Sequence, residues 1–402
     1  MKLPPQIATL DGKNYTVQTE ISPVVVGSTP PPTGNGYTVR AGKILDSTGA
    51  EVQLRGINHF GFNAVGALQP MYLWQMGWKQ QIAQIKSLGF NAIRCPFVPD
   101  TLYAPASARG YADPGLNPEL TGKTPLQVLD LWMEEVDRQG LYILLDFHSV
   151  SSMALYFHWF VTEPLDYSAG KWAETYNRQQ YTEADWIRDL TYVATRYAKL
   201  RNFIGIDIFN EPHDRVRWAT GGPGLFLWKP AAEKASAAIL AANPNLLIFV
   251  QGISDNWEGK EKSIPINWGE NFQPQAYAPL NIPADKLVLS PHSYGPDVYM
   301  EPEFDAANYP ANLAANWEQL FGQFYPKHPV IVGEWGGRYG VGGAGVKDKQ
   351  WQDAFVDYLV AKGIRSSFYW CYTPNSGDTG GILDDQLNVR QDKMANIKRH
   401  WA

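Results

Sequence analysis

Eight short apolar runs, rich in β-branched residues, alternate along the chain with segments of helical periodicity. The runs are "LRGINHFG" (54–61), "FNAIRCPF" (90–97), "LYILLDFH" (141–148), "FIGIDIFNE" (203–211), "LLIFVQG" (246–252), "KLVLSPHSY" (286–294), "VIVGEWGG" (330–337) and "SSFYWCYTP" (366–374). Strands that alternate with helices form a parallel sheet, and runs that are apolar on both faces are covered on both sides. Eight such units predict an α/β fold, a (β/α)8 TIM barrel with enlarged loops after its strands.

The alternative is an open, doubly wound sheet, which usually carries a glycine-rich phosphate turn after its first strand. The segment "GINHFGFNAVG" (56–66) has glycines but not the dinucleotide spacing, so the barrel is favoured. We expect the barrel domain to span 37–402 and to open with a small hairpin that turns at 46–49. Residues 1–36 contain "TPPPTGNG" and are predicted to be an N-terminal extension or linker remnant.

Composition excludes several classes of protein. The chain has 402 residues, 45% hydrophobic and 18% charged, and a net charge of -6, which argues against a nucleic-acid partner. No apolar run reaches the length of about 18 residues that a membrane span needs. The start, "MKLPPQIATLDGKNY", lacks the apolar core of a signal peptide. Two cysteines, Cys95 and Cys371, do not make a disulfide framework, and alternation along their strands turns both away from the pocket.

Each predicted strand ends in polar or aromatic residues, and in a barrel all these ends open on one face, where active sites lie. In chain order they are Asn58 and His59, Arg94, His148, Asn210 and Glu211, Gln251, His292 and Tyr294, Glu334, and Trp370. Two carboxylates facing each other across a pocket can cleave a glycosidic bond, one as the acid and one as nucleophile or base. Arg94 is placed to keep one carboxylate charged, and Tyr294 to donate a hydrogen bond to it.

The chain resembles glycoside hydrolase family 5, and within it the bacterial endoglucanases, through "NAIRCPF", "DFH", "FNEPHD", "SPHSY", "VGEWGG" and "FYWCY". The resemblance covers roughly residues 37–402 and implies a retaining mechanism without metal or cofactor. It implies that Glu211 is the acid/base and Glu334 the nucleophile. The supporting roles it implies fall on Arg94 and Tyr294 at the nucleophile, Asn210 at the sugar 2-hydroxyl, His292 beside the acid/base, His148 lining the site, and Trp370 as the floor under the sugar.

Substrate preference is less constrained by the sequence. Trp268, in the long loop after the fifth strand, and Trp74 are candidate platforms for further sugar rings, and His59 either reaches the sugar or packs beneath it. The loop after the third strand (149–185) is long and aromatic, and either walls one end of the cleft or packs on the rim. His213 is expected to support the loop that carries Glu211. Closely paired histidines on one strand are missing from the sequence, which disfavours a catalytic metal.

The sequence therefore predicts an endo-β-1,4-glucanase, a cellulase, that acts on a β-1,4-linked polysaccharide. A mannanase, a xyloglucanase, a mixed-linkage glucanase, or a carbohydrate-binding barrel without catalysis are the alternatives. We expect a monomer with no nucleic-acid or membrane partner. We also expect it to be secreted, because polymeric cellulose lies outside cells.

Overall fold

The computed structural model describes residues 6–10, 13–17, 36–150, 181–213, 216–222, 225–254 and 266–402. The chain divides into two compact units, Met1–Thr33 and Gly34–Ala402. In the first, β1 (Gln6–Leu10) pairs antiparallel with β2 (Lys13–Val17), a hairpin that the sequence did not predict. The site and all the chemistry described below belong to the second unit.

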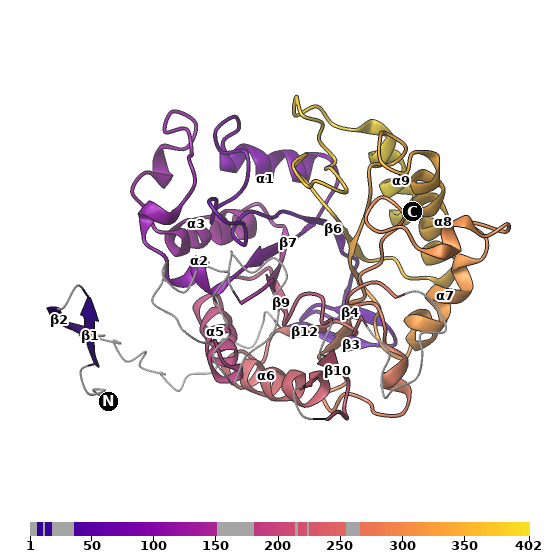
Figure 1. Ribbon diagram of the computed structural model, residues 1–402, viewed down its shortest axis with the longest axis horizontal. Helices are drawn as coiled ribbons and strands as arrows, with labels where there is room; N and C mark the ends of the chain where they lie inside the picture. The colour runs from indigo at the N-terminus through magenta and orange to yellow at the C-terminus, as the bar shows by residue number, and fades with distance from the viewer. Residues whose placement is uncertain are drawn as a thin grey trace. The chain divides into compact units, whose positions relative to one another are not determined.

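Eight parallel strands form the centre of the second unit, and helices surround them (Figure 1). The strands are β6 (Arg55–Asn58), β7 (Ala92–Phe97), β8 (Tyr142–Phe147), β9 (Phe203–Asp207), β12 (Leu247–Val250), β13 (Leu287–Leu289), β14 (Val332–Trp335) and β15 (Ser367–Tyr369). Their order in the sheet is β13-β12-β9-β8-β7-β6-β15-β14. Parallel bridges from Leu289 to Val330 and from His292 to Glu334 join the two end strands, so the sheet closes. The predicted TIM barrel is confirmed.

The α-helices that the structure describes in this unit follow the strands in the order that the periodicity predicts. They are α1 (Trp78–Ser87), α2 (Pro99–Tyr103), α3 (Pro125–Arg138), α5 (Glu183–Arg196), α6 (Trp228–Ala242), α7 (Leu313–Leu320), α8 (Val346–Lys362) and α9 (Gln391–Trp401). None of the described helices is long and apolar enough to cross a bilayer. A short parallel pair, β10 (Val216–Arg217) and β11 (Phe226–Leu227), lies between β9 and α6.

Helix α3 shows how local sequence sets these elements. Thr124 accepts a hydrogen bond from the Gln127 N–H, Gln127 caps it in return, and Pro125 occupies the first turn, where its missing N–H costs nothing. Val128, Trp132 and Val136 then recur at a spacing of four and bury one face of the helix against the barrel.

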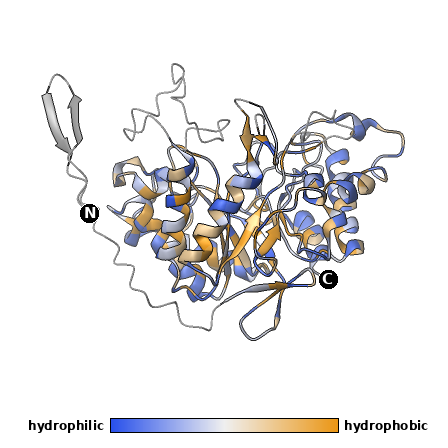
Figure 2. Cartoon of the chain, turned by 90° about the horizontal axis from the view of Figure 1, so that it is seen from below, coloured by the Kyte–Doolittle hydropathy of each residue, from blue (hydrophilic) through white to orange (hydrophobic). Residues whose placement is uncertain are grey.

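Alternation along the barrel strands separates two cores. On β7, Ile93, Cys95 and Phe97 belong to the large apolar cluster between strands and helices, whereas Ala92 faces the barrel interior and Arg94 follows it on the same side. The barrel strands are accordingly the hydrophobic centre of this unit (Figure 2). The interior is thus apolar at the amino ends of the strands and polar at their carboxyl ends, where the site is built.

The amino end of the barrel is closed by a small antiparallel sheet of β3 (Thr38–Arg40), β4 (Lys43–Leu45) and β5 (Glu51–Val52). Val39, Ile44 and Val52 join the interior cluster of the barrel. Asp46 caps the turn by accepting from the N–H groups of Thr48 and Ala50, as an Asx-type turn does. The predicted hairpin is therefore present and carries one strand more.

Both cysteines are free and buried. Cys95 lies in the outer core, as predicted from alternation. Cys371 points its thiol at the carbonyl oxygen of Thr373, 3.3 Å away.

Candidate active site

The carboxyl ends of the strands surround a pocket of about 950 Å³. Its lining residues are His148, Asn210, Glu211, Ile266, Asn267, Trp268, Tyr294, Val298, Tyr299, Glu301, Glu334, Trp370, Ser376, Asp378 and Thr379. Seven of the residues singled out from the sequence are in this lining. Arg94 and His292 lie fully buried next to it, as the contacts below show.

Arg94, at 0% exposed, holds together the ends of five strands. Its guanidinium lies 2.5 Å from Glu334 Oε1 and donates to Asn58 and Asn210 at 3.0 and 2.9 Å. It also pairs with Asp146 and Asp207, each at 2.9 Å. A buried cation needs this many acceptors, because desolvation would otherwise be prohibitive.

Sequence reasoning missed Asn58, Asp146 and Asp207 as the partners of Arg94. The available signal was a charged residue inside an apolar strand, in "ILLDF" and "IGIDI". Such a residue must face a counter-charge in the barrel interior.

Glu334, at 3% exposed, has both carboxylate oxygens occupied. Oε1 contacts Arg94, and Oε2 accepts a hydrogen bond of 2.7 Å from the Tyr294 hydroxyl. Burial raises the pKa of Glu334, while the positive charge of Arg94 and the hydrogen bond from Tyr294 oppose this rise. These two contacts favour the ionised form, which a nucleophile requires.

Glu211 follows β9 with its backbone in the left-handed region, at φ 51, where a residue other than glycine is strained. The surrounding groups hold it there. Its N–H donates to Gln251 Oε1 at 2.7 Å, and its carbonyl oxygen lies 2.6 Å from His213 Nδ1. His213 thus supports this loop, as expected from the sequence.

The Glu211 carboxyl group lies 3.0 Å from His292 Nδ1. Burial, and then the nearby charge of Glu334, raise the pKa of Glu211 well above its ordinary value. Burial also lowers the pKa of His292, so the imidazole that contacts Glu211 is neutral. Of the two carboxyl groups, Glu211 is therefore the one whose surroundings favour the protonated form more strongly.

The two carboxyl groups are close. One oxygen of Glu211, one oxygen of Glu334 and a ring nitrogen of His292 all lie within 4.8 Å of one another. A carboxyl separation near 5–5.5 Å is typical of retaining glycosidases, whereas inverting enzymes need roughly 6.5–9.5 Å to admit a water. The approach of these two oxygens agrees with the shorter of the two separations.

Aromatic rings form the walls of the pocket. Trp370 stacks on Phe60 and on His148, with ring centroids 5.5 and 5.9 Å away, and donates its indole N–H to Ser376 at 3.0 Å. Trp268, which is 40% exposed, stacks on His213 at 3.8 Å with the rings parallel within 3°. Both indoles are fixed flat surfaces of the kind on which a sugar ring packs.

His59 and Trp74 lie outside the pocket lining. His59 is 1% exposed, its Nε2 lies 2.7 Å from Gln81, and its ring stacks on Tyr372, so it packs beneath the site. That is the second of the two alternatives drawn from the sequence, and the burial of His59 excludes a direct sugar contact in this conformation. Trp74 is 41% exposed and stacks on Tyr72 at 4.7 Å. The loop after the third strand (149–185), expected either to wall one end of the cleft or to pack on the rim, lies mostly outside the described residues.

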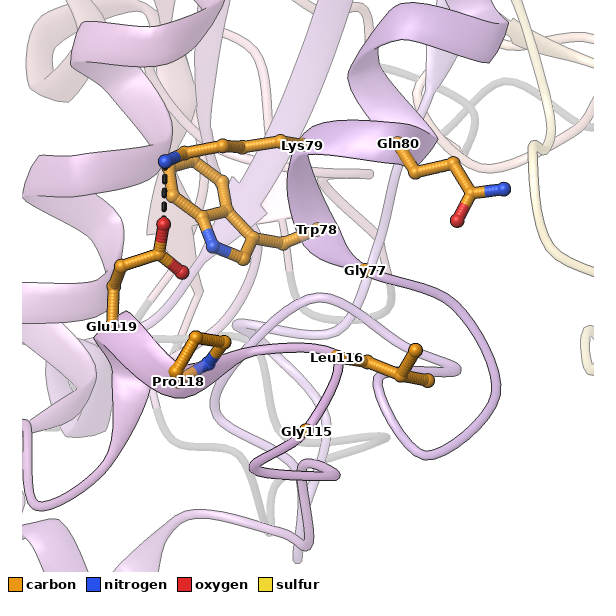
Figure 3. A pocket seen from close by; sticks show the side chains of 8 residues that line it. All are labelled: Gly77, Trp78, Lys79, Gln80, Gly115, Leu116, Pro118 and Glu119. Carbon is orange, nitrogen blue, oxygen red and sulfur yellow. Dashed lines mark hydrogen bonds and ion pairs between the residues drawn. The ribbon is translucent and has the colours of Figure 1, made fainter.

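A smaller hollow of about 410 Å³ lies at the start of α1 (Figure 3). It is lined by Gly77, Trp78, Lys79, Gln80, Gly115, Leu116, Pro118 and Glu119. The Lys79–Glu119 ion pair of 2.6 Å runs along one side, and the Trp78 ring is only 4% exposed. Without an exposed ring face or a carboxyl pair, this hollow has neither feature of the larger pocket.

Among the described residues, two groups of side chains at or beneath the main pocket have donor atoms close enough to hold an ion: Asp146 with His148 and Glu334, and Glu211 with His292 and Glu334. Both share Glu334, which already contacts the guanidinium of Arg94. A fixed positive charge at this position disfavours a cation in either group.

Comparison with known proteins places these features in a family. Residues 45–376 match the family model described as cellulase (glycosyl hydrolase family 5). The chain is 45% identical over 364 residues to the major extracellular endoglucanase of Xanthomonas campestris pv. campestris, covering 90% of this chain and 70% of that protein. It is 34% identical to an endoglucanase of Paenibacillus polymyxa, over 90% of this chain and 87% of that protein.

Solved structures agree. The catalytic domain of the Xanthomonas enzyme superposes with a TM-score of 0.81 at 43% identity, covering 91% of this chain and 99% of that one. A complex of an endocellulase from Pyrococcus horikoshii with cellotetraose gives a TM-score of 0.81 at 35% identity, covering 92% of this chain and 100% of that one. The chain belongs to the cellulase family, glycosyl hydrolase family 5.

Proposed function

We propose that this chain is a retaining endo-β-1,4-glucanase in which Glu334 is the nucleophile and Glu211 the acid/base. The chain is an endoglucanase of its family, and the proposal adds the residue roles and the stereochemistry. The observation that carries the proposal is the approach of a Glu211 oxygen and a Glu334 oxygen to within 4.8 Å. Arg94 and Tyr294 contact the Glu334 carboxylate, whereas the Glu211 carboxyl group contacts the neutral His292.

In the first step Glu211 gives its proton to the glycosidic oxygen while Glu334 attacks the anomeric carbon. The bond from that carbon to the leaving chain breaks, and a bond to the Glu334 oxygen forms. In the second step Glu211, now ionised, takes a proton from water. The water oxygen attacks the anomeric carbon and releases Glu334, so two inversions give net retention.

The supporting residues divide the remaining work. Arg94 and Tyr294 orient Glu334 and hold its charge. The Asn210 oxygen accepts from Arg94, so its amide nitrogen is the group that can donate to the sugar 2-hydroxyl. His292 orients Glu211, His148 lines the site with Asp146 fixing its ring at 2.6 Å, and Trp370 supports the sugar at the cleavage point.

A β-1,4-glucan is the substrate that the relatives favour, since they are endoglucanases and one was solved with cellotetraose. Trp268 would carry a second sugar ring within the pocket, and Trp74 a more distant one. The Xanthomonas relative is extracellular, which supports action on a polymer outside the cell. We expect the enzyme to act as a monomer, because the site is built from a single barrel.

The test is the release of reducing ends from carboxymethylcellulose, β-mannan, xyloglucan and a mixed-linkage glucan. We expect the wild type to be most active on carboxymethylcellulose, Glu334→Ala to be inactive, and Glu134→Ala, on the outer surface of α3, to match the wild type. Activity confined to mannan or xyloglucan would refute the substrate class. An active Glu334→Ala would refute the mechanism.

A further inference from the structure

The pocket wall that follows β15 is held from behind by a buried lysine. Lys393, on the last helix α9, is 1% exposed. Its ammonium group donates to the carbonyl oxygens of Thr379 and Gly381 at 3.0 and 2.8 Å and lies 5.8 Å from the centre of the Tyr369 ring.

Burial of this ammonium charge is energetically unfavourable. No carboxylate forms an ion pair with Lys393 in the part of the chain that the structure describes, and its neighbour Asp392 pairs with Arg390 instead. A buried ammonium without a counter-ion is unfavourable unless its hydrogen bonds are made by other groups. Here two loop carbonyls make them, so the charge stabilises one conformation of that loop.

The loop in question reaches the floor of the pocket. Ser376, Asp378 and Thr379 line the pocket. The Ser376 hydroxyl accepts the indole N–H of Trp370 at 3.0 Å and itself accepts from the Thr379 hydroxyl at 2.8 Å. A continuous chain of contacts therefore runs from Lys393 through Thr379 and Ser376 to Trp370.

We propose that Lys393 is a positioning residue for glucan binding: it holds the 376–381 loop so that Ser376 fixes the Trp370 indole under the sugar. The inference rests on the proposed function, because it takes Trp370 to be the sugar platform. Lys393 would thus control the orientation of the Trp370 indole without contacting the substrate.

The state of the amine depends on pH. Burial lowers the pKa of Lys393 to about 8. The titratable and charged groups facing the amine are Tyr369 on β15, Cys371 just beyond it, Asp348 on α8, and Arg390 and Asp392 at the start of α9. Loss of the proton weakens the two hydrogen bonds to the loop, since charge-assisted bonds are the stronger kind.

The test is binding of cellotetraose by calorimetry in a Glu334→Gln background, which separates binding from turnover. Lys393→Met should raise the Kd for cellotetraose about fivefold, which corresponds to the net contribution of about one hydrogen bond. Lys398→Met, exposed on the same helix, is the matched control and should leave the Kd unchanged. An unchanged Kd in Lys393→Met would overturn the proposal.

Two further readouts exclude a merely structural role. The losses from Lys393→Met and Ser376→Ala should be less than additive in the double variant, because both act on Trp370; full additivity would contradict this. In the protein that retains Lys393, the Kd for cellotetraose should rise as the pH increases from about 7 to about 9.5. In Lys393→Met the Kd should not change over this range. A flat Kd in the Lys393 protein would overturn the proposal even if Lys393→Met failed to fold.

The outcomes also separate this inference from the proposed function. A wild type that releases no reducing ends from any β-glucan refutes the proposed function. A wild type that does so, but whose cellotetraose binding ignores Lys393 and pH, refutes only the role of Lys393.

Discussion

A single arginine distinguishes the surroundings of the two neighbouring glutamates. Arg94 contacts Glu334 directly, and Asp146 and Asp207 hold its guanidinium in place from the other side. Within the described residues Glu211 forms no ion pair with a lysine or arginine, and its carboxyl group faces a neutral imidazole. We therefore expect two identical side chains to take opposite roles because their surroundings differ.

Replacing Arg94 should destabilise the fold as well as abolish activity. Arg94→Met leaves buried carboxylates without their counter-charge, and we expect a loss of about 3–5 kcal/mol in unfolding free energy. Arg196→Met, which breaks a partly exposed pair with Asp130, should cost about 0–1 kcal/mol. Urea denaturation monitored by circular dichroism measures both, and equal losses would contradict this account of Arg94.

Removing the proton donor should affect substrates unequally. Glu211→Ala should lower kcat/KM on cello-oligosaccharides by about 10²–10⁴-fold, the usual contribution of general acid catalysis. An aryl cellobioside with an acidic phenol needs little protonation, so its glycosylation step should be nearly unaffected. Steady-state and burst kinetics on the two substrates measure this, and an equal loss of the glycosylation rate on both would refute the role of Glu211.

At the residue scale the sequence predicted which side chains meet, because the ends of parallel strands share one face. It did not predict how they bond. Asn58, Asp146 and Asp207 were missed as partners of Arg94, and Ser376 and Asp378 as pocket residues, because these contacts depend on distances between strands and on loop conformation. The sequence left the position of His59 ambiguous. Neighbouring residues at the end of a strand point to opposite sides, so a shift of one residue decides whether a side chain enters the pocket or packs beneath it.

Among the elements, β13 and β14 approach each other closely beside the site. A Cβ atom added at Gly333 would lie 2.6 Å from Ser290 Oγ and 2.8 Å from His292 Nε2. Glycine at this position lets the two strands approach, and so sets the distance from His292 to both glutamates.

Gly333→Ala should therefore impair catalysis through His292. We expect a fall in kcat/KM of up to about 10²-fold, since a displacement of about 1 Å in an active site can cost that much. Gly222→Ala, where the added methyl group meets nothing within 4 Å, is the control. Hydrolysis of cellotetraose measures both variants, and full activity in Gly333→Ala would show that the junction tolerates the displacement.

All eight barrel strands were predicted at the right places, but each is shorter than its apolar run. Most of the runs continue past the end of the strand into the following loop; thus "KLVLSPHSY" is a strand only at Leu287–Leu289. Residue type alone does not mark where pairing stops. The β1–β2 hairpin was missed because proline-rich sequence next to it favours an extended linker.

For the molecule as a whole, buried carboxyl groups should make stability fall as pH rises. Burial raises the pKa of Glu270 to about 7, and that of Asp348 also to about 7. Between their ordinary values and about pH 7 the folded state binds more protons than the unfolded state, so the unfolding free energy declines with pH.

The dependence of the unfolding free energy on pH can be tested at Glu270. Glu270→Gln should reduce the decline in unfolding free energy between about pH 4.5 and about pH 7, because the amide has no proton to lose. Glu134→Gln, exposed on α3, should keep the wild-type slope. Thermal or urea unfolding across this range measures it, and an unaltered slope in Glu270→Gln would show that Glu270 is ionised throughout.

The central claim, that Glu211 and Glu334 cleave the bond by double displacement, is tested most directly by the anomeric configuration of the first product. Proton NMR of cellotetraose during the first minutes of hydrolysis distinguishes the two anomers before mutarotation mixes them. We predict that the β-anomer appears first at the new reducing end, because a carboxyl separation this small fits direct attack by Glu334 rather than attack by a water held between Glu334 and the sugar. Initial appearance of the α-anomer would mean inversion, and would contradict the role of Glu334 as nucleophile.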